Sequence, residues 1–202
     1  MSRRRVVVLL EGASDVAALR ALLSDTLLDG AVELVDMRGV TNVRRFLEDV
    51  LRGGGVARVL GLCDAAEQTY VAQALAGSGA DVEASAMADL GFHICRADLE
   101  DELIRALGPE RTVAELADLG LATRFAQFRQ QPAWRGQPLA DQLRRFAGVA
   151  SGRKALLAEA LASALSPGEA PPPLAALLTQ LEVAVADEDD GPAVRPFPRS
   201  SV

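Results

Sequence analysis

Acidic side chains follow three apolar stretches of the sequence, and they are the residues best placed to do chemistry. Glu11 comes directly after VVVLL, Asp36 after AVELV and Asp64 after RVLGLC. Apolar runs rich in β-branched residues are typical of strands that are buried on both faces of a parallel sheet. Ligands bind beyond the carboxyl ends of such strands. We therefore expect Glu11, Asp36 and Asp64 to share one edge of the sheet.

A further acid, Asp15, follows Glu11 by one helical turn. Asp15 has two interpretations, a helix cap, which is the commoner role for Asp at a helix start, or part of a functional site. Glu11 favours function more directly, because a carboxylate that ends a buried strand is costly unless it is solvated, paired or bound to a cation. Carboxylates gathered on one edge suit hard, oxygen-liganded cations such as Mg²⁺ or Mn²⁺.

Strand and helix patterns alternate through the first half of the chain, which predicts an α/β fold with a mostly parallel sheet of about four strands and helices on both faces. The predicted strands cover residues 6–10, 31–36, 58–63 and 80–84, and residues 91–95 are a further short candidate. Apolar residues at three- and four-residue steps predict the intervening helices at 15–28, 43–51, 67–76 and 98–107.

The second half has only helical patterns, and the chain is expected to divide into three parts. Residues 1–108 form the α/β domain, residues 109–186 a helical extension that packs on it, and residues 187–202 an acidic and Pro-rich tail. Thr112 with Glu115 forms a capping-box pattern that predicts a helix start. The predicted helices cover residues 112–119, 124–129, 139–146, 153–165 and 174–186.

Composition excludes several functional classes. The chain of 202 residues carries a net charge of −7, which argues against nucleic-acid binding driven by charge alone but not against an acidic site that meets phosphates through a metal. Two cysteines are too few for a disulfide scaffold, and neither a Walker loop nor a Cys/His zinc spacing is present. Ser14 lacks a nearby base for nucleophilic catalysis. No apolar stretch suits a signal peptide or a membrane span, so we expect a cytoplasmic protein.

Four segments, in order, resemble the motifs of one family. Residues 11–15 (EGASD) after an apolar strand resemble the first motif of toprim domains, and residues 35–64 resemble the toprim continuation in the OLD (overcoming-lysogenization-defect) nucleases. Residues 98–100 (DLE) resemble that family's later acidic motif, and residues 151–154 (SGRK) resemble the segment with its essential lysine. The resemblance spans roughly residues 4–165 and implies a toprim-type, Rossmann-like fold.

The resemblance also implies an activity and a set of roles. The activity is Mg²⁺- or Mn²⁺-dependent cleavage of a nucleic-acid phosphodiester, with DNA as the expected substrate. Lys154, the only lysine of the chain, would offset charge on the phosphate in the transition state. Glu11 and Lys154 are the expected catalytic residues, and the expected metal ligands, direct or through water, are Glu11, Asp15, Asp64 and Glu100.

The sequence departs from the family pattern after the third strand. Toprim domains usually carry Asp-x-Asp there, whereas this chain has Asp64, Ala65, Ala66 and Glu67. Three roles are open for Glu67: it compensates for the missing acid at position 66, it binds the metal through water, or it has no role in the site. The departure also leaves an alternative function open, a non-catalytic toprim module that binds a separate ATPase subunit. Homo-oligomerisation is open as well, and no membrane partner is expected.

Overall fold

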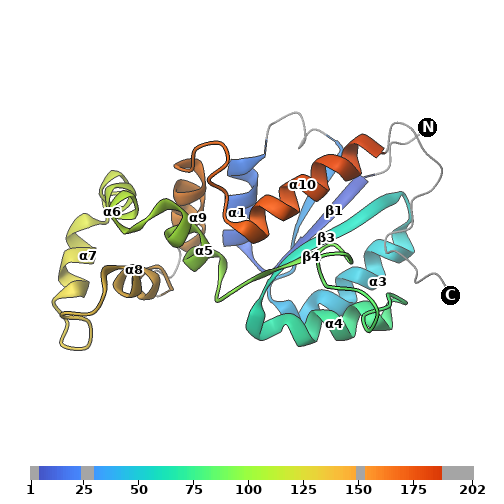
Figure 1. Cartoon of the computed structure of the whole chain (residues 1–202), viewed down its shortest axis with the longest axis horizontal. Coiled ribbons are helices and arrows are strands. Elements are labelled where there is room, and N and C mark those ends of the chain that lie inside the picture. The colour runs from blue at the N-terminus through green and yellow to red at the C-terminus, as the bar shows by residue number, and fades with distance from the viewer. Residues whose placement is uncertain (1–4, 24–29, 149–152, 188–202) are drawn as a thin grey trace.

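A computed structural model describes residues 5–23, 30–148 and 153–187 of the chain (Figure 1). Its centre is a four-stranded parallel sheet of order β2-β1-β3-β4. The strands are β1 (Arg5–Leu10), β2 (Val32–Asp36), β3 (Val56–Asp64) and β4 (Phe92–Cys95). Leu10 is paired with Asp36, and Asp64 with Cys95, so the carboxyl ends of all four strands meet at one edge.

Helices cover both faces of this sheet, because successive side chains of a strand point to opposite sides. Val7 and Leu9 of β1 belong to the apolar cluster shared with α3 (Val43–Gly53) and α4 (Gln68–Gly77). The alternate residues of β1 belong to a second cluster with α1 (Ala13–Leu22) and α10 (Pro172–Ala186). Figure 1 shows these two helical layers on either side of the strands. The predicted α/β fold, with a parallel sheet of four strands and helices on both faces, is confirmed.

The fourth strand lies elsewhere than first predicted. Residues 80–84 form no strand, and the edge position beside β3 is taken by Phe92–Cys95, which the sequence marked only as a further candidate. The ring of Phe92 packs over Gly61 of β3 so closely that a Cβ on Gly61 would collide with it. Gly91, at φ +89°, makes the turn into β4 against the carbonyl of Val59. A large buried aromatic side chain therefore selects this segment over the small residues of 80–84.

In the part of the chain that the structure describes, α10 and five other helices follow β4: α5 (Leu99–Leu107), α6 (Pro109–Asp118), α7 (Ala122–Arg129), α8 (Leu139–Gly148) and α9 (Lys154–Ser163). Helices α6, α7 and α8 form one end of the molecule, whereas α9 packs against α1 and α10 packs across the sheet (Figure 1). Within residues 5–23, 30–148 and 153–187, no helix is long and apolar enough to cross a membrane. The division at residue 108 stays a prediction, and residues 188–202 lie outside the described part.

The helix starts predicted at residues 15, 112, 124 and 174 lie two or three residues after the starts in the structure. Thr112 does not cap α6, because Pro109 already occupies its first turn, and the Thr112 hydroxyl instead donates a hydrogen bond to the Gly108 carbonyl at 2.8 Å. Helix α1 begins at Ala13 rather than Asp15, with Gly12 as its N-cap. The remainder of the helix predicted over 15–28 lies outside the described residues beyond position 23.

Candidate metal centre

The residues that the sequence marked for chemistry all line one pocket. This pocket, of about 550 Å³, lies beyond the carboxyl ends of the strands and is closed on one side by α5 and α9. Its lining includes every predicted catalytic and ligand residue, namely Glu11, Asp15, Asp64, Glu100 and Lys154. It also includes Asp36, so the three strand-end acids share one edge as expected. The roles of these residues stay predictions.

Two of these pocket residues, Glu11 and Asp64, belong to a tighter group of three carboxylates. Glu11, Asp64 and Glu67 each present an oxygen, and the three oxygens lie within 4.8 Å of one another. Glu67 was the residue whose role the sequence left open. It reaches the group because Ala65–Glu67 form a short 3-10 helix directly after β3. In a 3-10 helix a side chain returns to the same side after three residues, which places Glu67 over Asp64.

Crowding and burial make two of these carboxylates, those of Asp64 and Glu67, unusually basic. Burial raises the pKa of Asp64 to about 8, and the negative charges of Glu11 and Glu67 add to the effect. Burial, followed by the contact with Glu11, raises the pKa of Glu67 to about 7. Oε2 of Glu67 is buried and accepts no hydrogen bond from the described chain. An unsatisfied buried oxygen beside two other carboxylate oxygens fits a divalent cation, since Mg²⁺ and Mn²⁺ take hard oxygen ligands.

Asp15 contributes to the start of α1 and also lines the pocket, whereas its role in a functional site stays a prediction. As the third residue of α1, it accepts a hydrogen bond from the backbone N–H of Gly12 at 3.0 Å, which caps the helix. Its carboxylate also lines the pocket, where burial, opposed in part by that hydrogen bond, raises its pKa to about 7. The negative charges of Glu100 and Glu11 contribute to the same rise. Asp15 therefore belongs to the electrostatics of the site as well as to the helix.

Glu100 and Lys154 meet across the interface between α5 and α9. Nζ of Lys154 lies 3.3 Å from Oε1 of Glu100, whose side chain is only 4% exposed. Partial burial opposes the positive charge of Lys154, but the carboxylate of Glu100 outweighs this effect and raises the lysine's pKa. Lys154 thus stays charged at the border of the pocket. Residues 151 and 152, which belong to the same motif, lie outside the described residues.

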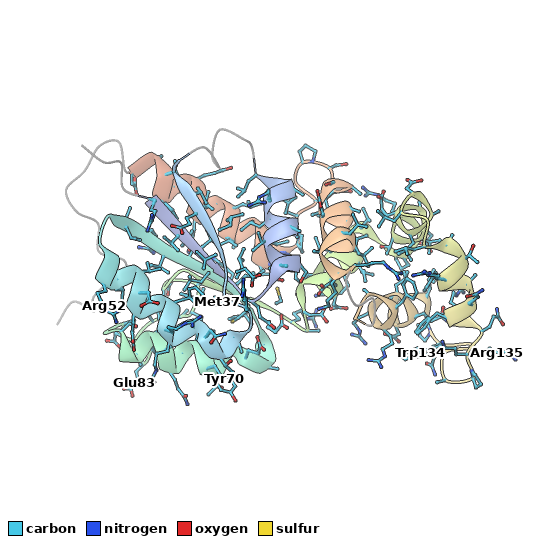
Figure 2. All side chains as sticks on the ribbon, turned by 180° about the vertical axis from the view of Figure 1, so that it is seen from behind. Met37, Arg52, Tyr70, Glu83, Trp134 and Arg135 are labelled. Atoms are coloured by element: carbon cyan, nitrogen blue, oxygen red, sulfur yellow. The ribbon has the colours of Figure 1, made fainter. Side chains whose placement is uncertain are left out.

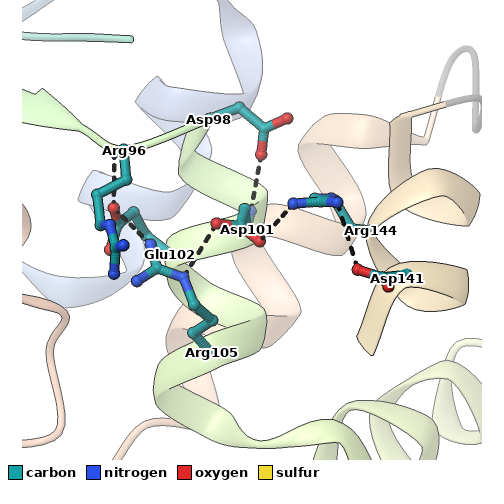
Figure 3. A network of polar contacts seen from close by, with 7 residues as sticks. All are labelled: Arg96, Asp98, Asp101, Glu102, Arg105, Asp141 and Arg144. Atoms are coloured by element: carbon teal, nitrogen blue, oxygen red, sulfur yellow. Dashed lines mark hydrogen bonds and ion pairs between the residues drawn. The ribbon is translucent and has the colours of Figure 1, made fainter. Parts of the chain in front are cut away.

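The other acids in the first turn of α5 have different partners (Figure 3). Asp98 accepts a hydrogen bond from the backbone N–H of Asp101 at 2.7 Å and so caps the helix. Asp101 lies 3.0 Å from Nε of Arg105, and Glu102 lies 2.6 Å from the same guanidinium. Each of these acids therefore has a hydrogen-bond or ion-pair partner. Their position in the first turn is also favourable because negative charge is stabilised near the N-terminal end of the helix dipole. Glu100 is the first-turn acid that faces Lys154.

Arg38, in the loop after β2, also lines the pocket. It follows β2 with a left-handed backbone (φ 56°), which is uncommon for a residue with a side chain. Its backbone N–H donates to Oδ1 of Asp36 at 2.8 Å, and the next N–H, of Gly39, donates to the carbonyl of Glu11 at 2.8 Å. Asp36 therefore holds this turn rather than joining the three-carboxylate group. Within the described ranges no ion pair neutralises the Arg38 guanidinium, which lines the pocket with Lys154.

Comparison with solved structures identifies the same fold in two bacterial proteins. No protein-family model and no curated protein matches the sequence. The C-terminal region of the Burkholderia pseudomallei OLD protein matches with a TM-score of 0.64 and 16% identity, over 90% of this chain and 98% of that one. The C-terminal region of the Xanthomonas campestris pv. campestris OLD protein matches with a TM-score of 0.64 and 20% identity, over 95% and 100%.

The chain folds like the C-terminal region of OLD proteins. The resemblance to the toprim part of OLD proteins, first seen in four short motifs, is thereby confirmed as a likeness of fold over nearly the whole chain. At 90% and 95% of this chain, the matches extend beyond the sheet into the helical segments after β4. At these identities the likeness to OLD proteins concerns the fold, and the chemistry is argued from the residues of this chain.

Proposed function

We propose that this protein is a divalent-metal-dependent hydrolase that cleaves phosphodiester bonds of nucleic acid, with DNA as its substrate. The observation that carries the proposal is the convergence of Glu11, Asp64 and Glu67 within 4.8 Å at the edge of a toprim-type sheet. The fold shared with OLD proteins and the four sequence motifs support the same activity. The ion is proposed to be Mg²⁺ or Mn²⁺.

The three carboxylates would hold the cation, and Asp15 and Glu100 border the same pocket as further ligands through water. When bound, such a cation activates water for attack and offsets negative charge on the phosphate. In the metal-free protein, burial and repulsion hold the pKa of Asp64 at about 8, so cation binding must displace a proton there near neutral pH. Metal affinity should accordingly rise with pH.

Two cations at the border of the pocket, Lys154 and Arg38, are proposed to bind the substrate's phosphate. Lys154 is held by Glu100 at 3.3 Å, and Arg38 is presented by a turn that is hydrogen-bonded to the backbone of Glu11. Lys154 is proposed to stabilise charge that develops on the phosphate during cleavage. Arg38 is proposed to hold the phosphate in register through its planar guanidinium. Local cations of this kind allow an acidic protein to bind a polyanion at one place.

The experiment is a comparison of Asp64→Asn with Asp118→Asn, the same chemical change at an exposed residue that ends α6. Calorimetric titration with Mg²⁺ and Mn²⁺ is combined with a plasmid-nicking assay on the same samples. We expect Asp64→Asn to lose metal binding and to lower nicking at least about 100-fold, because it removes a direct ligand. Asp118→Asn should match the wild type in both measurements.

Two outcomes would contradict the proposal. Nicking that is undiminished in Asp64→Asn would remove the carboxylate group from the chemistry. A wild type that neither binds metal nor nicks DNA would favour the alternative, a non-catalytic module that binds a separate ATPase. The position of Glu67 speaks against that alternative, because it supplies the third carboxylate that Ala66 lacks.

A further inference from the structure

A second groove begins where the metal pocket ends. It has a volume of about 600 Å³ and lies between the start of α5 and helix α8, and Asp98 lines both cavities. Its lining contains an aromatic side chain, an amide and two arginines, namely Trp134, Gln137, Arg144 and Arg145. Neither the motifs nor the proposed chemistry gives this groove a role. A volume of this size is ample for a nucleoside.

Trp134 is fixed in place at the turn between α7 and α8 (Figure 2). Its ring stacks on Phe128, with centroids 5.4 Å apart and planes 25° apart, and Phe128 in turn packs against Phe146. Its carbonyl accepts a hydrogen bond at 2.8 Å from Gln142, whose side chain is buried. The tryptophan is half-buried and lines the groove, so the indole is a rigid aromatic surface at the groove's edge.

The two arginines of the groove differ in their partners. Arg144 lies 3.3 Å from Asp141 and 3.6 Å from Asp101, which holds α8 to α5 (Figure 3). Arg145 is exposed, and the described part of the chain offers it no ion pair. Of the acids that line the groove, Asp98 accepts a hydrogen bond that caps α5, and Asp141 is paired with Arg144. The positive charge of Arg145 is therefore the least neutralised in the groove.

We propose that this groove binds an unpaired nucleotide of the substrate strand that leaves the metal pocket, with its base stacked on Trp134 and its phosphate on Arg145. Aromatic side chains bind single strands by stacking, and arginines follow the backbone. A base in a duplex is already stacked and cannot lie on a side chain. The inference rests on the proposed function for the identity of the strand, and it specifies a single-stranded or frayed nucleic acid as the preferred substrate.

The experiment uses the fact that Trp134 is the only tryptophan of the chain. A short oligo(dT) single strand is titrated into the protein in Ca²⁺, which carboxylates also ligate, and the intrinsic fluorescence is recorded. We expect the single strand to quench Trp134, and a duplex of equal length to quench it far less. A labelled oligo(dT), followed by anisotropy, gives the affinity independently of the tryptophan.

Three variants test the residues by anisotropy. Trp134→Ala should weaken oligo(dT) binding about tenfold, whereas Trp134→Phe should keep most of the affinity because it retains an aromatic face. Arg145→Ala should weaken binding and reduce the salt dependence by about one charge. Arg124→Ala, at an exposed arginine of α7 outside the groove, is the matched control and should bind like the wild type. Arg145 is a surface residue, so its variant stays informative even where Trp134→Ala unfolds.

The outcomes separate this inference from the proposed function. If oligo(dT) quenches Trp134 but the protein never hydrolyses DNA, the proposal that the groove binds a nucleotide is supported and the proposed hydrolase activity is contradicted. The groove proposal alone is contradicted if DNA hydrolysis depends on Asp64 but oligo(dT) does not quench the Trp134 fluorescence. In that case Trp134→Ala would also bind oligo(dT) with the affinity of the wild type. A fluorescence change that follows protein concentration without any oligonucleotide also overturns it, because the occupant is then a second copy of the chain.

Discussion

Glu67 shows how one residue's local geometry decides the composition of a site. The acid two positions after Asp64 is replaced by Ala66, and an acid three positions after it completes the carboxylate group instead. The 3-10 conformation of Ala65–Glu67 makes this exchange possible, since position 67 returns over position 64 whereas position 66 falls a third of a turn short. An acid at position 66 would accordingly point away from Glu11.

This geometry predicts the behaviour of two variants. Glu67→Gln should weaken Mn²⁺ binding by at least about tenfold, because it removes a charged ligand and leaves the neighbouring acids in place. Glu67→Ala combined with Ala66→Asp should stay as weak as Glu67→Ala alone. Calorimetric titration with Mn²⁺ measures both. Recovery of wild-type affinity in the double variant would show that the turn does not hold its 3-10 form in solution.

Two helices from distant parts of the chain bring the lysine and its carboxylate together. Helix α5 carries Glu100, and α9 carries Lys154 after the three helices at the end of the molecule. Packing of α9 against α1, through buried residues such as Leu157 and Leu161, sets the position of Lys154. The helical segments therefore complete the pocket that the sheet begins.

The Glu100–Lys154 pair predicts separate effects on stability and activity. Lys154→Met should lower the free energy of unfolding by about 1–3 kcal/mol, because it leaves a buried carboxylate without its partner. Adding Glu100→Gln removes that charge and should recover much of the loss, while DNA nicking stays low without the lysine. Chemical denaturation and the nicking assay measure the two properties. Nicking that returns together with stability would make Lys154 a structural residue only.

The acidic pocket should make the stability of the whole protein depend on pH and metal. Burial, with repulsion between the acids, raises the pKa of Asp15 and Glu67 to about 7 and that of Asp64 to about 8. The folded protein then keeps protons that the unfolded chain loses at lower pH. The resulting stabilisation is fully present below the ordinary carboxyl pKa, declines above it, and is lost once the pH has risen through 7 and 8.

His93 acts in the opposite direction at lower pH. It is buried, with Nε2 lying 3.2 Å from the side-chain oxygen of Gln180, and burial lowers its pKa. Because the unfolded chain binds a proton at this imidazole more readily than the folded protein does, stability falls as the pH drops below the ordinary histidine value of 6.5. The window in which the carboxylates set the slope therefore lies above that pH and below 9.0, the ordinary cysteine pKa, because burial also raises the pKa of Cys63 and Cys95 in the folded protein.

We expect the melting temperature in chelator to fall by on the order of a few degrees between about pH 6.5 and about pH 8.5. Added Mg²⁺ should stabilise the protein most at the upper end of this range, where the acids are ionised. Scanning calorimetry at several pH values measures both effects. Asp64→Asn should flatten the slope and Asp118→Asn should not. An equal slope in both variants would show that other groups cause it.

The strands and the acids that follow them could be predicted from the sequence, because local patterns of apolar residues indicate which segments are buried. Apolar runs predicted three of the four strands, and the acids after them were placed on one edge because parallel strands end together. Glu11, Asp15 and Asp64 therefore lie where expected, in the pocket that the motifs led us to predict. Such features depend on the chain's immediate neighbours and on the alternation of side chains, which a single sequence contains.

Only the tertiary structure decided the features that depend on contacts between distant segments. The close packing of Phe92 on Gly61 selected β4 over residues 80–84, because a buried ring outweighs a weak local strand pattern. The 3-10 conformation of the turn after β3 brings position 67, rather than position 66, next to Glu11. The groove between Asp98 and Trp134 exists because α8 is packed against α5, a contact that no local pattern encodes.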